Sequence, residues 1–234
     1  MICALFRGLL DGFFPSKCAS CGALGASPFC AVCSVGLLEA SPLQLRGTAH
    51  TRAVFEYGGP IARAIWRLKY DGRIELGRTL GRELRPELSK LDDIDVVVPI
   101  PLSPARLKKR GYNQARELAV GLDAGPLRTG LRRRDGPGRQ VGRARADRWA
   151  HARGAFSPIE RELAGRHVLL VDDVITTGAT LEAAAKAATE GGARSVQALA
   201  LARAEARAVG RRSDDPGAPH RRDSVGATGA EAFG

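Results

Sequence analysis

Residues 168–181 read VLLVDDVITTGATL, an apolar run that ends in two adjacent carboxylates and continues into a turn of threonine and glycine. An apolar run of this length, bounded by turn residues and followed by an alanine-rich stretch, predicts a buried parallel strand that leads into a helix. Such a strand brings Asp172 and Asp173 to its C-terminal edge, where open α/β sheets bind their ligands. The chain is therefore expected to form an α/β fold with a binding site at that edge.

The turn after the acidic pair has the composition of an anion site. Its hydroxyls and backbone N–H groups lie at the start of the predicted helix, where the helix dipole also favours negative charge. The residues of this turn are Thr176, Thr177, Gly178, Ala179 and Thr180. We expect a phosphate group on the turn, and hydroxyl groups or a metal ion at the two carboxylates. An ordinary buried strand and capped helix is the simpler alternative, but it requires neither the paired acids nor the threonine-rich turn.

These residues resemble the phosphoribosyl pyrophosphate (PRPP) signature of type I phosphoribosyltransferases. The resemblance implies that residues 176–180 hold the 5-phosphate of PRPP and that Asp172 and Asp173 bind its ribose hydroxyls. Mg²⁺ is then the expected cofactor, because a hard cation bridges pyrophosphate and ribose oxygens. Two other phosphate-binding folds are excluded. A response-regulator receiver needs a second strand with a phosphoacceptor aspartate and then a lysine, but after Asp173 only one more strand-like run appears, at 195–201, and no lysine follows Lys186. A Walker P-loop needs a GxxxxGK motif that the chain lacks.

Four of the five cysteines form two CxxC pairs within 16 residues, and they are Cys18, Cys21, Cys30 and Cys33. Two CxxC turns can direct four thiolates at one ion, and tetrahedral Zn²⁺ suits such a set. A disulfide clip and a thioredoxin-like redox pair are the alternatives. The paired spacing, without a surrounding βαβ pattern, favours zinc in a closed structural site. Cys3 is expected to be a small buried apolar residue.

The net charge of +11 is concentrated in one segment. Residues 103–153 contain 14 Lys or Arg and 4 Asp or Glu, which indicates an anion site, with a solvated charged surface as the alternative for residues 132–134. A strand predicted at 94–98 ends at two prolines and leads into a basic loop at 103–111, then into a helix from about Asn113. The cations of this loop should lie on the same sheet edge as the acidic pair. They are Arg106, Lys108, Lys109 and Arg110.

Several elements together resemble the ComF family of competence-associated, phosphoribosyltransferase-like proteins. They are the double CxxC module, ARAIWRLKYDG at 62–72, PIPL and RGYNQA within 99–115, and RQVGRARADRWAHARGAF at 139–156. The resemblance runs from about Phe14 to Arg203. It implies a type I phosphoribosyltransferase-like parallel sheet with helices on both faces, preceded by a small zinc-knuckle module.

The sequence divides into three expected parts: an N-terminal helix and zinc module at 1–45, a phosphoribosyltransferase-like domain at 46–203, and a disordered tail at 204–234. A short strand is predicted at 52–57, and core strands near 94–98, 127–131, 167–171 and 195–201. Apolar spacing at 61–68 predicts a helix, with Arg67 and Lys69 off its apolar stripe. Either side chain could reach a phosphate, but a solvated helix face is favoured for both.

The glycine- and arginine-rich segment 135–154 is expected to be a loop that closes over the site as a lid, with Arg143, Arg145 and Arg148 facing the ligand. No apolar run reaches the length of a membrane span. The opening residues also lack a basic start and a cleavage site. We therefore expect a cytoplasmic protein without membrane insertion.

Two functions remain open. In the first, the protein transfers a phosphoribosyl group to a nitrogenous acceptor, with Asp172 and Asp173 on the ribose and Arg106 and Arg110 on pyrophosphate. Loss of pyrophosphate leaves oxocarbenium character, so this reaction needs positioning and charge compensation rather than a covalent nucleophile. In the second, implied by the ComF resemblance, the protein senses PRPP while its basic face holds single-stranded DNA during DNA uptake.

Overall fold

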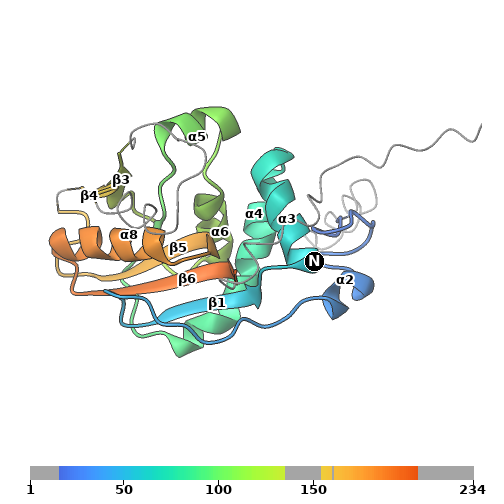
Figure 1. The fold of residues 1–234 in the computed structure, drawn as a ribbon, viewed down its shortest axis with the longest axis horizontal. Helices are drawn as coiled ribbons and strands as arrows, with labels where there is room; N and C mark the ends of the chain where they lie inside the picture. The colour runs from blue at the N-terminus through green and yellow to red at the C-terminus, as the bar shows by residue number, and fades with distance from the viewer. Residues whose placement is uncertain (1–15, 135–153, 160, 205–234) are drawn as a thin grey trace, which may run out of the picture.

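The computed structural model describes residues 16–134, 154–159 and 161–204, and its core is a four-stranded parallel sheet. The strands lie in the spatial order β1 (Thr51–Glu56), β6 (Ser195–Arg203), β5 (His167–Ile175) and β2 (Val96–Pro99), and the first three are labelled in Figure 1. The strands expected at 52–57, 94–98, 167–171 and 195–201 are confirmed. The predictions for the N-terminal helix, the lid loop from residue 135 to 153, and the tail from residue 205 lie outside the described residues.

Helices cover both faces of the sheet, as expected for this fold class. One face packs against α8 (Ala179–Glu190), whose buried alanines allow the helix to lie close to the valines and alanines of the strands. The other face packs against three helices and a 3₁₀ segment. These are α3 (Gly59–Tyr70), α4 (Ile74–Gly81), η1 (Arg82–Lys90) and α6 (Gln114–Leu122). Because both faces are covered, the strands are almost continuously apolar.

Glycines permit the close crossing of α4 and α6. A Cβ atom at Gly121 would overlap the backbone carbonyl of Arg78, and one at Gly81 would overlap that of Leu118. Since any larger residue would separate the two helices, their contact depends on these positions.

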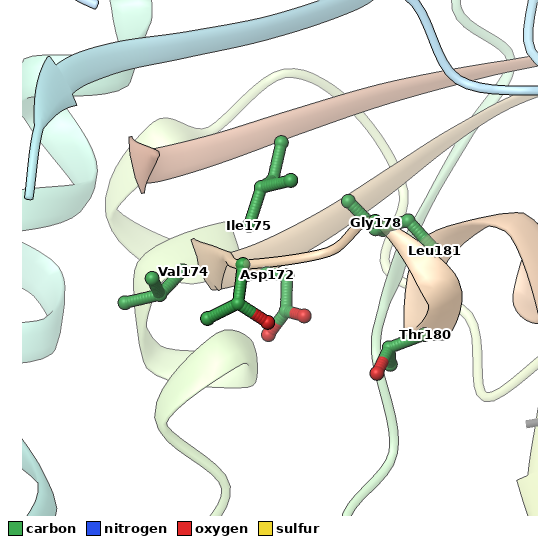
Figure 2. Close-up of a pocket in the computed structure, with 7 residues that line it drawn as sticks. Asp172, Val174, Ile175, Gly178, Thr180 and Leu181 are labelled. Atoms are coloured by element: carbon green, nitrogen blue, oxygen red, sulfur yellow. The ribbon is translucent and has the colours of Figure 1, made fainter. Parts of the chain in front are cut away.

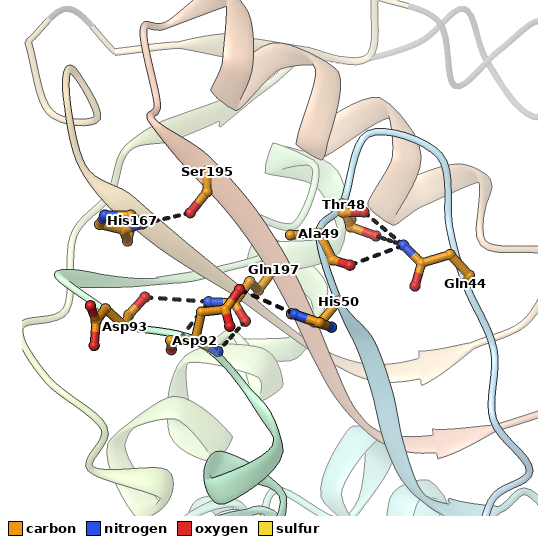
Figure 3. A network of polar contacts seen from close by, with 9 residues as sticks. All are labelled: Gln44, Thr48, Ala49, His50, Asp92, Asp93, His167, Ser195 and Gln197. Atoms are coloured by element: carbon orange, nitrogen blue, oxygen red, sulfur yellow. Dashed lines mark hydrogen bonds and ion pairs between the residues drawn. The ribbon is translucent and has the colours of Figure 1, made fainter.

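A polar network ties the segment before β2 to the N-terminal part of β6 (Figure 3). The Oε1 atom of the fully buried Gln197 accepts a hydrogen bond from the backbone N–H of Asp92 at 2.9 Å. Its Nε2 atom donates to the carbonyls of Asp92 and Asp93, each at 3.3 Å. His50 Nε2 lies 3.1 Å from Asp92 Oδ2. A buried amide needs such partners, so the network fixes this segment at the edge opposite the acidic pair.

The prediction of a core strand at 127–131 is wrong. Leu127 makes a single parallel bridge to Val97, and the chain then leaves the sheet. Gly130 crosses Leu163 so closely that a Cβ atom would overlap its side chain. The chain then forms β3 (Leu131–Arg133), which pairs antiparallel with β4 (Phe156–Pro158) in a separate two-stranded sheet.

The basic segment at 103–111 is not an irregular loop but contains a helix, α5 (Pro104–Arg110). Ser103 is its N-cap, with Oγ accepting from the backbone N–H of Arg106 at 3.4 Å, and Pro104 occupies the first helical position. Gly111 ends the helix in the left-handed conformation. The helix expected from about residue 113 is confirmed, with Asn113 as the N-cap of α6.

The cysteine-rich segment folds as a small module beside α3. It contains a bridge between Lys17 and Leu24 and one short helix, α2 (Ala31–Val35). From there the chain runs along β1, where Glu39 bridges to Phe55, and reaches the start of α8. The module and the sheet are thus joined through α3 and β1.

Candidate functional site

The acidic pair lies within β5, which is longer than predicted and runs on to Ile175. Ile100 N donates to Val171 O at 2.9 Å, so the chain leaving β2 passes directly beside the acids. Successive strand residues point to opposite faces, so Asp172 and Asp173 have different surroundings. The pair is therefore placed at the C-terminal edge of the sheet, as the sequence predicts.

Asp173 is the more buried carboxylate, with 5% of its surface exposed. Its Oδ1 atom lies 2.9 Å from the Nζ atom of Lys69 on α3. Its Oδ2 atom is buried and has no hydrogen-bond partner among the described residues. A buried carboxylate oxygen without a donor costs free energy, so this atom is an acceptor suited to a ligand hydroxyl.

Asp172 lines a pocket at the end of β5, shown with the start of α8 in Figure 2. Its Oδ1 atom accepts from the backbone N–H of Asp173 at 2.8 Å. Burial and the neighbouring charge of Asp173 raise the pKa of Asp172 to about 7, against the opposing effects of that N–H group, Lys69 and Arg133. The pocket is lined by Asp172, Val174, Ile175, Thr176, Gly178, Thr180 and Leu181.

The threonine-rich turn forms the start of α8, as predicted, and residues 176–180 lie together there. Gly178 is its N-cap residue, with φ of +80°, and a Cβ atom at this position would overlap the side chain of Leu45. Only glycine meets both conditions without strain. The Oγ1 atom of Thr177 accepts from Ala179 N at 3.4 Å, while Thr176 is exposed. The first N–H groups of a helix have no intrahelical partner, so this turn presents donors to the pocket.

The basic residues of α5 follow the C-terminal end of β2, on the predicted side of the sheet. Arg106, Lys108 and Lys109 are exposed, whereas Arg110 is partly buried over the ring of Tyr70. None of the four pairs with a carboxylate within the described part of the chain. The charge of Arg106 acts on Arg133, an arginine of β3 that is described next.

Arg133 on β3 is a site residue that the sequence did not identify, since residues 132–134 were treated as a solvated surface. Its guanidinium lies 5.1 Å from the ring centroid of Phe156. Burial, followed by the charge of Arg106, lowers the pKa of Arg133, and Asp172 opposes this. The second sheet therefore holds one cation whose charge interacts with both Arg106 and Asp172.

Lys69 is a second residue whose role was missed, and the prediction of a solvated position for it is wrong. It lies four residues after the buried Ile65, at the border of the apolar face of α3, which is the signal that the sequence offered. Arg67 is also not on a free surface. Its guanidinium packs against Gly22, and its Nε atom lies 3.8 Å from an oxygen of Asp71.

The four cysteines of the two CxxC pairs come together as predicted, with all sulfur atoms within 4.8 Å of one another. The sulfurs of Cys21 and Cys30 lie 3.7 Å apart. A tetrahedral zinc ion with Zn–S bonds of about 2.3 Å requires sulfurs about 3.8 Å apart, so the set fits one such ion. Burial opposes ionisation of Cys18, but backbone N–H groups outweigh it and lower the pKa of that thiol to about 6.

The module contacts the helix that carries Lys69. Arg63 Nε donates to the buried Ser20 Oγ at 3.0 Å, and Arg67 lies against Gly22. Both contacts come from α3, so one helix touches the cysteine module along part of its length and the acidic pair near its C-terminal end.

The phosphoribosyl transferase domain model matches residues 106–218 of the chain. Competence protein F of Haemophilus influenzae is 35% identical over 162 residues, which cover 63% of this chain and 70% of that protein. Competence protein ComFC of Streptococcus pneumoniae is 30% identical over 198 residues, or 80% of each chain. DNA utilization protein YhgH of Escherichia coli is 31% identical over 166 residues, 64% of this chain and 70% of that protein. In the described ranges, no helix is long and apolar enough to cross a membrane.

Proposed function

Because the chain belongs to the ComF family of phosphoribosyltransferase-like competence proteins, we propose that it binds Mg²⁺–PRPP at the acidic pair and transfers the phosphoribosyl group to a nitrogenous acceptor, releasing pyrophosphate. The observation that carries the proposal is the buried Oδ2 atom of Asp173, which has no hydrogen-bond partner among the described residues and lies on the strand that leads into the N-terminus of α8. It supplies an acceptor for a ribose hydroxyl next to Asp172, which lines the pocket together with Thr176, Gly178 and Thr180 of the turn.

Different residues of the site contact different parts of the ligand. The turn at 176–180 holds the 5-phosphate through hydroxyls and backbone N–H groups. Asp172 and Asp173 accept hydrogen bonds from the ribose hydroxyls. Arg106 and Arg133, whose positive charges act on each other, bind the pyrophosphate. A bound anion reduces the repulsion between the two guanidinium groups. The ligand-bound state is therefore favoured over the empty site.

Charge compensation drives the reaction in this arrangement. When the bond to pyrophosphate breaks, positive charge develops on the ribose ring, and the carboxylates of Asp172 and Asp173 lie beside that ring to stabilise it. The arginines stabilise the negative charge on the departing pyrophosphate. Bound Mg²⁺ supplies further neutralisation of the pyrophosphate oxygens. No covalent nucleophile is required, and fixed positioning of the two reactants supplies the rest of the rate.

Lys69 explains how the acids tolerate each other before a ligand binds. Two adjacent carboxylates at a buried edge repel, and the 2.9 Å contact to Lys69 neutralises one of them. The other, Asp172, is held partly protonated by its raised pKa. Ligand binding at neutral pH therefore includes release of a proton from Asp172.

Isothermal titration of the protein with PRPP and Mg²⁺ tests the binding step. Asp173→Asn and Thr177→Ala should each weaken binding at least about tenfold, because each removes a charge-assisted or anion contact. Asp93→Asn, at the opposite end of the sheet, is the matched control and should bind normally. Equal affinity in the wild type and both site variants would contradict the proposal.

The transfer step is tested by incubating the protein with PRPP, Mg²⁺ and a panel of nucleobases and measuring pyrophosphate. Pyrophosphate that depends on one base supports transfer. Tight binding of PRPP without release supports the second candidate, a PRPP sensor that holds single-stranded DNA, which is favoured by relatives named for competence and DNA utilisation.

The lid and the metal complete the proposal. Arg143, Arg145 and Arg148 belong to a segment that closes over the ligand and excludes water. Replacing all three by Gln should lower PRPP affinity or transfer without changing the thermal unfolding temperature. At the other end of the chain, Cys18, Cys21, Cys30 and Cys33 hold one structural Zn²⁺.

A further inference from the structure

Tyr112, which lies between α5 and α6, reaches the last turn of α3. Its hydroxyl group donates a hydrogen bond to the backbone carbonyl of Leu68. Leu68 is two residues from the end of α3, and the last four carbonyls of a helix have no partner within the helix. The hydroxyl therefore satisfies a helix end, and it does so at the residue directly before Lys69.

The residue directly after Lys69 is held from the same segment. The guanidinium carbon of Arg110, the last residue of α5, lies 5.3 Å from the ring centroid of Tyr70. Gly111 separates Arg110 from Tyr112 and ends α5 in the left-handed conformation, with φ of +79°. One short segment thus contacts both neighbours of Lys69 in the chain.

This segment is also fixed to the sheet. Asn113 Nδ2 donates to the carbonyl of Ile100 at 3.0 Å, and Ile100 N donates to Val171 O at 2.9 Å. Val171 directly precedes the acidic pair on β5. Tyr112 packs against the core cluster on the same face of the sheet as α3 and α6. The end of α3 is therefore tied to β5 by the segment at 110–113 as well as by its own ion pair.

The ion pair of Lys69 depends on where the end of α3 lies. A lysine side chain is a flexible four-carbon stem, and holding it in one geometry costs conformational entropy. In the structure, the ammonium group contacts Asp173 Oδ1, while Asp173 Oδ2 has no partner among the described residues. A shift of the helix end would change which carboxylate oxygen the lysine reaches. The position of α3 therefore decides whether Oδ2 is open to a ligand hydroxyl.

We propose that Tyr112 is a positioning residue. Its hydroxyl group holds the last turn of α3 so that Lys69 neutralises Asp173 through Oδ1 and leaves Oδ2 open to the ligand. In this role Tyr112 acts through Lys69 and not on the ligand itself. The simpler alternative is that the ring fills space beside α6 and the hydroxyl only satisfies a helix end. The effect on the ion pair can be measured without a ligand, whereas the effect on PRPP binding rests on the proposed function.

A double-mutant cycle with Tyr112→Phe and Lys69→Met, titrated with PRPP and Mg²⁺, tests this role. Tyr112→Phe removes only the hydroxyl, and it should weaken PRPP binding by about 2- to 12-fold, the range that corresponds to the net free energy of one hydrogen bond. In the Lys69→Met background, the same change should alter the affinity by less than about twofold, because the side chain that Tyr112 positions is absent. A purely structural hydroxyl would lower the affinity by the same factor in both backgrounds.

Thermal unfolding measures the same cycle without a ligand. Tyr112→Phe should lower Tm by about 2–4 °C in the wild type and by less in Lys69→Met, because part of the loss in the wild type comes from the ion pair with Asp173. Thr189→Val is the matched control. It removes a hydroxyl that donates to the carbonyl of Ala185 near the other end of α8, at 3.1 Å, and it should leave PRPP affinity unchanged.

Two results would overturn the proposal: unchanged PRPP affinity in Tyr112→Phe, or an equal loss of affinity in the wild-type and Lys69→Met backgrounds. A wild-type protein that binds no PRPP would refute the proposed function. The unfolding cycle then decides alone, as it does if Lys69→Met binds too weakly to be titrated, and equal Tm shifts in the two backgrounds would refute the positioning role. Circular dichroism of each variant checks that the fold is retained.

Discussion

Lys69 Nζ on α3 and Asp173 Oδ1 on β5 lie 2.9 Å apart, so a helix outside the signature motif supplies the countercharge of its most buried carboxylate. The side chains are 20% and 7% exposed. Since solvent screens such a pair only weakly, its disruption should affect both folding and ligand binding.

Lys69→Met should destabilise the protein by about 2 kcal/mol, because it leaves a buried carboxylate without its cation. Thermal unfolding would show this as a fall of roughly 4–8 °C in Tm for a chain of this size. Adding Asp173→Asn should recover most of the lost stability, because the second change removes the unpaired buried charge. A double variant no more stable than Lys69→Met would show that the two side chains are not energetically coupled. Lys90→Met, which removes the pair of a half-exposed lysine with Glu87, is the control.

Asp172→Asn should stabilise the protein, and more at pH 8 than at pH 4. The folded-state pKa of about 7 lies above that of an unfolded aspartate, so the native state binds more protons, and stability falls as pH rises from about 4 to 7. Burial and the charge of Asp173 raise this pKa, and Lys69 and Arg133 oppose them. Asparagine removes this dependence, and a Tm gain of about 3–6 °C at pH 8 would correspond to 1–2 kcal/mol. The expectation fails if the gain is the same at both pH values, or if Asp93→Asn gives an equal gain.

Gly178→Ala should cost about 2 kcal/mol or more in stability, because an added methyl group overlaps Leu45 and φ is positive. Gly165→Ala separates the two causes, since Gly165 also has a positive φ of +70° but has nothing within 4 Å of the added atom. Comparing the free energies of unfolding in urea isolates the cost of the overlap. Equal losses in the two variants would mean that Leu45 yields without cost. Only Gly178→Ala should also weaken PRPP binding, because it shifts the first turn of α8.

Metal analysis of protein purified without added zinc should find about one zinc ion per chain. Removing it with a chelator should lower Tm, since ligand binding to the folded state alone contributes to stability. Cys30→Ser should lower the zinc content, whereas Cys3→Ser, outside the cluster, should not. A folded protein with four reactive thiols and no metal would remove the zinc assignment.

Short, strongly patterned stretches were enough to predict the central strands, the turn before α8 and the clustering of the cysteines. A continuous apolar run marks a buried strand, and the CxxC spacing marks a tight turn. Both patterns can be recognised within a short stretch of sequence. The prediction of a strand at 127–131 was wrong because this stretch has too few apolar residues. The path of the backbone at Gly130 also depends on packing against Leu163, which is distant in sequence.

Lys69 and Arg133 were missed for a related reason. Each becomes part of the site through the way in which separate elements pack, and no motif within α3 or β3 marks it. The same holds for Tyr70, whose ring meets Arg110 only in the folded chain. Charged residues near an apolar stripe are ambiguous in sequence, since a solvated position and a buried ion pair have the same local pattern.

The pairing of β3 with β4 fixes the two ends of the arginine-rich segment, and Arg134 N donates to Ala155 O at 2.9 Å where it begins and ends. The pairing of β3 with β4 therefore compensates the entropy that is lost when these two ends are held together. Doubling the number of residues between them would cost only about 0.6 kcal/mol. A change in the number of residues between the two ends should therefore leave Arg133, on β3, in its place.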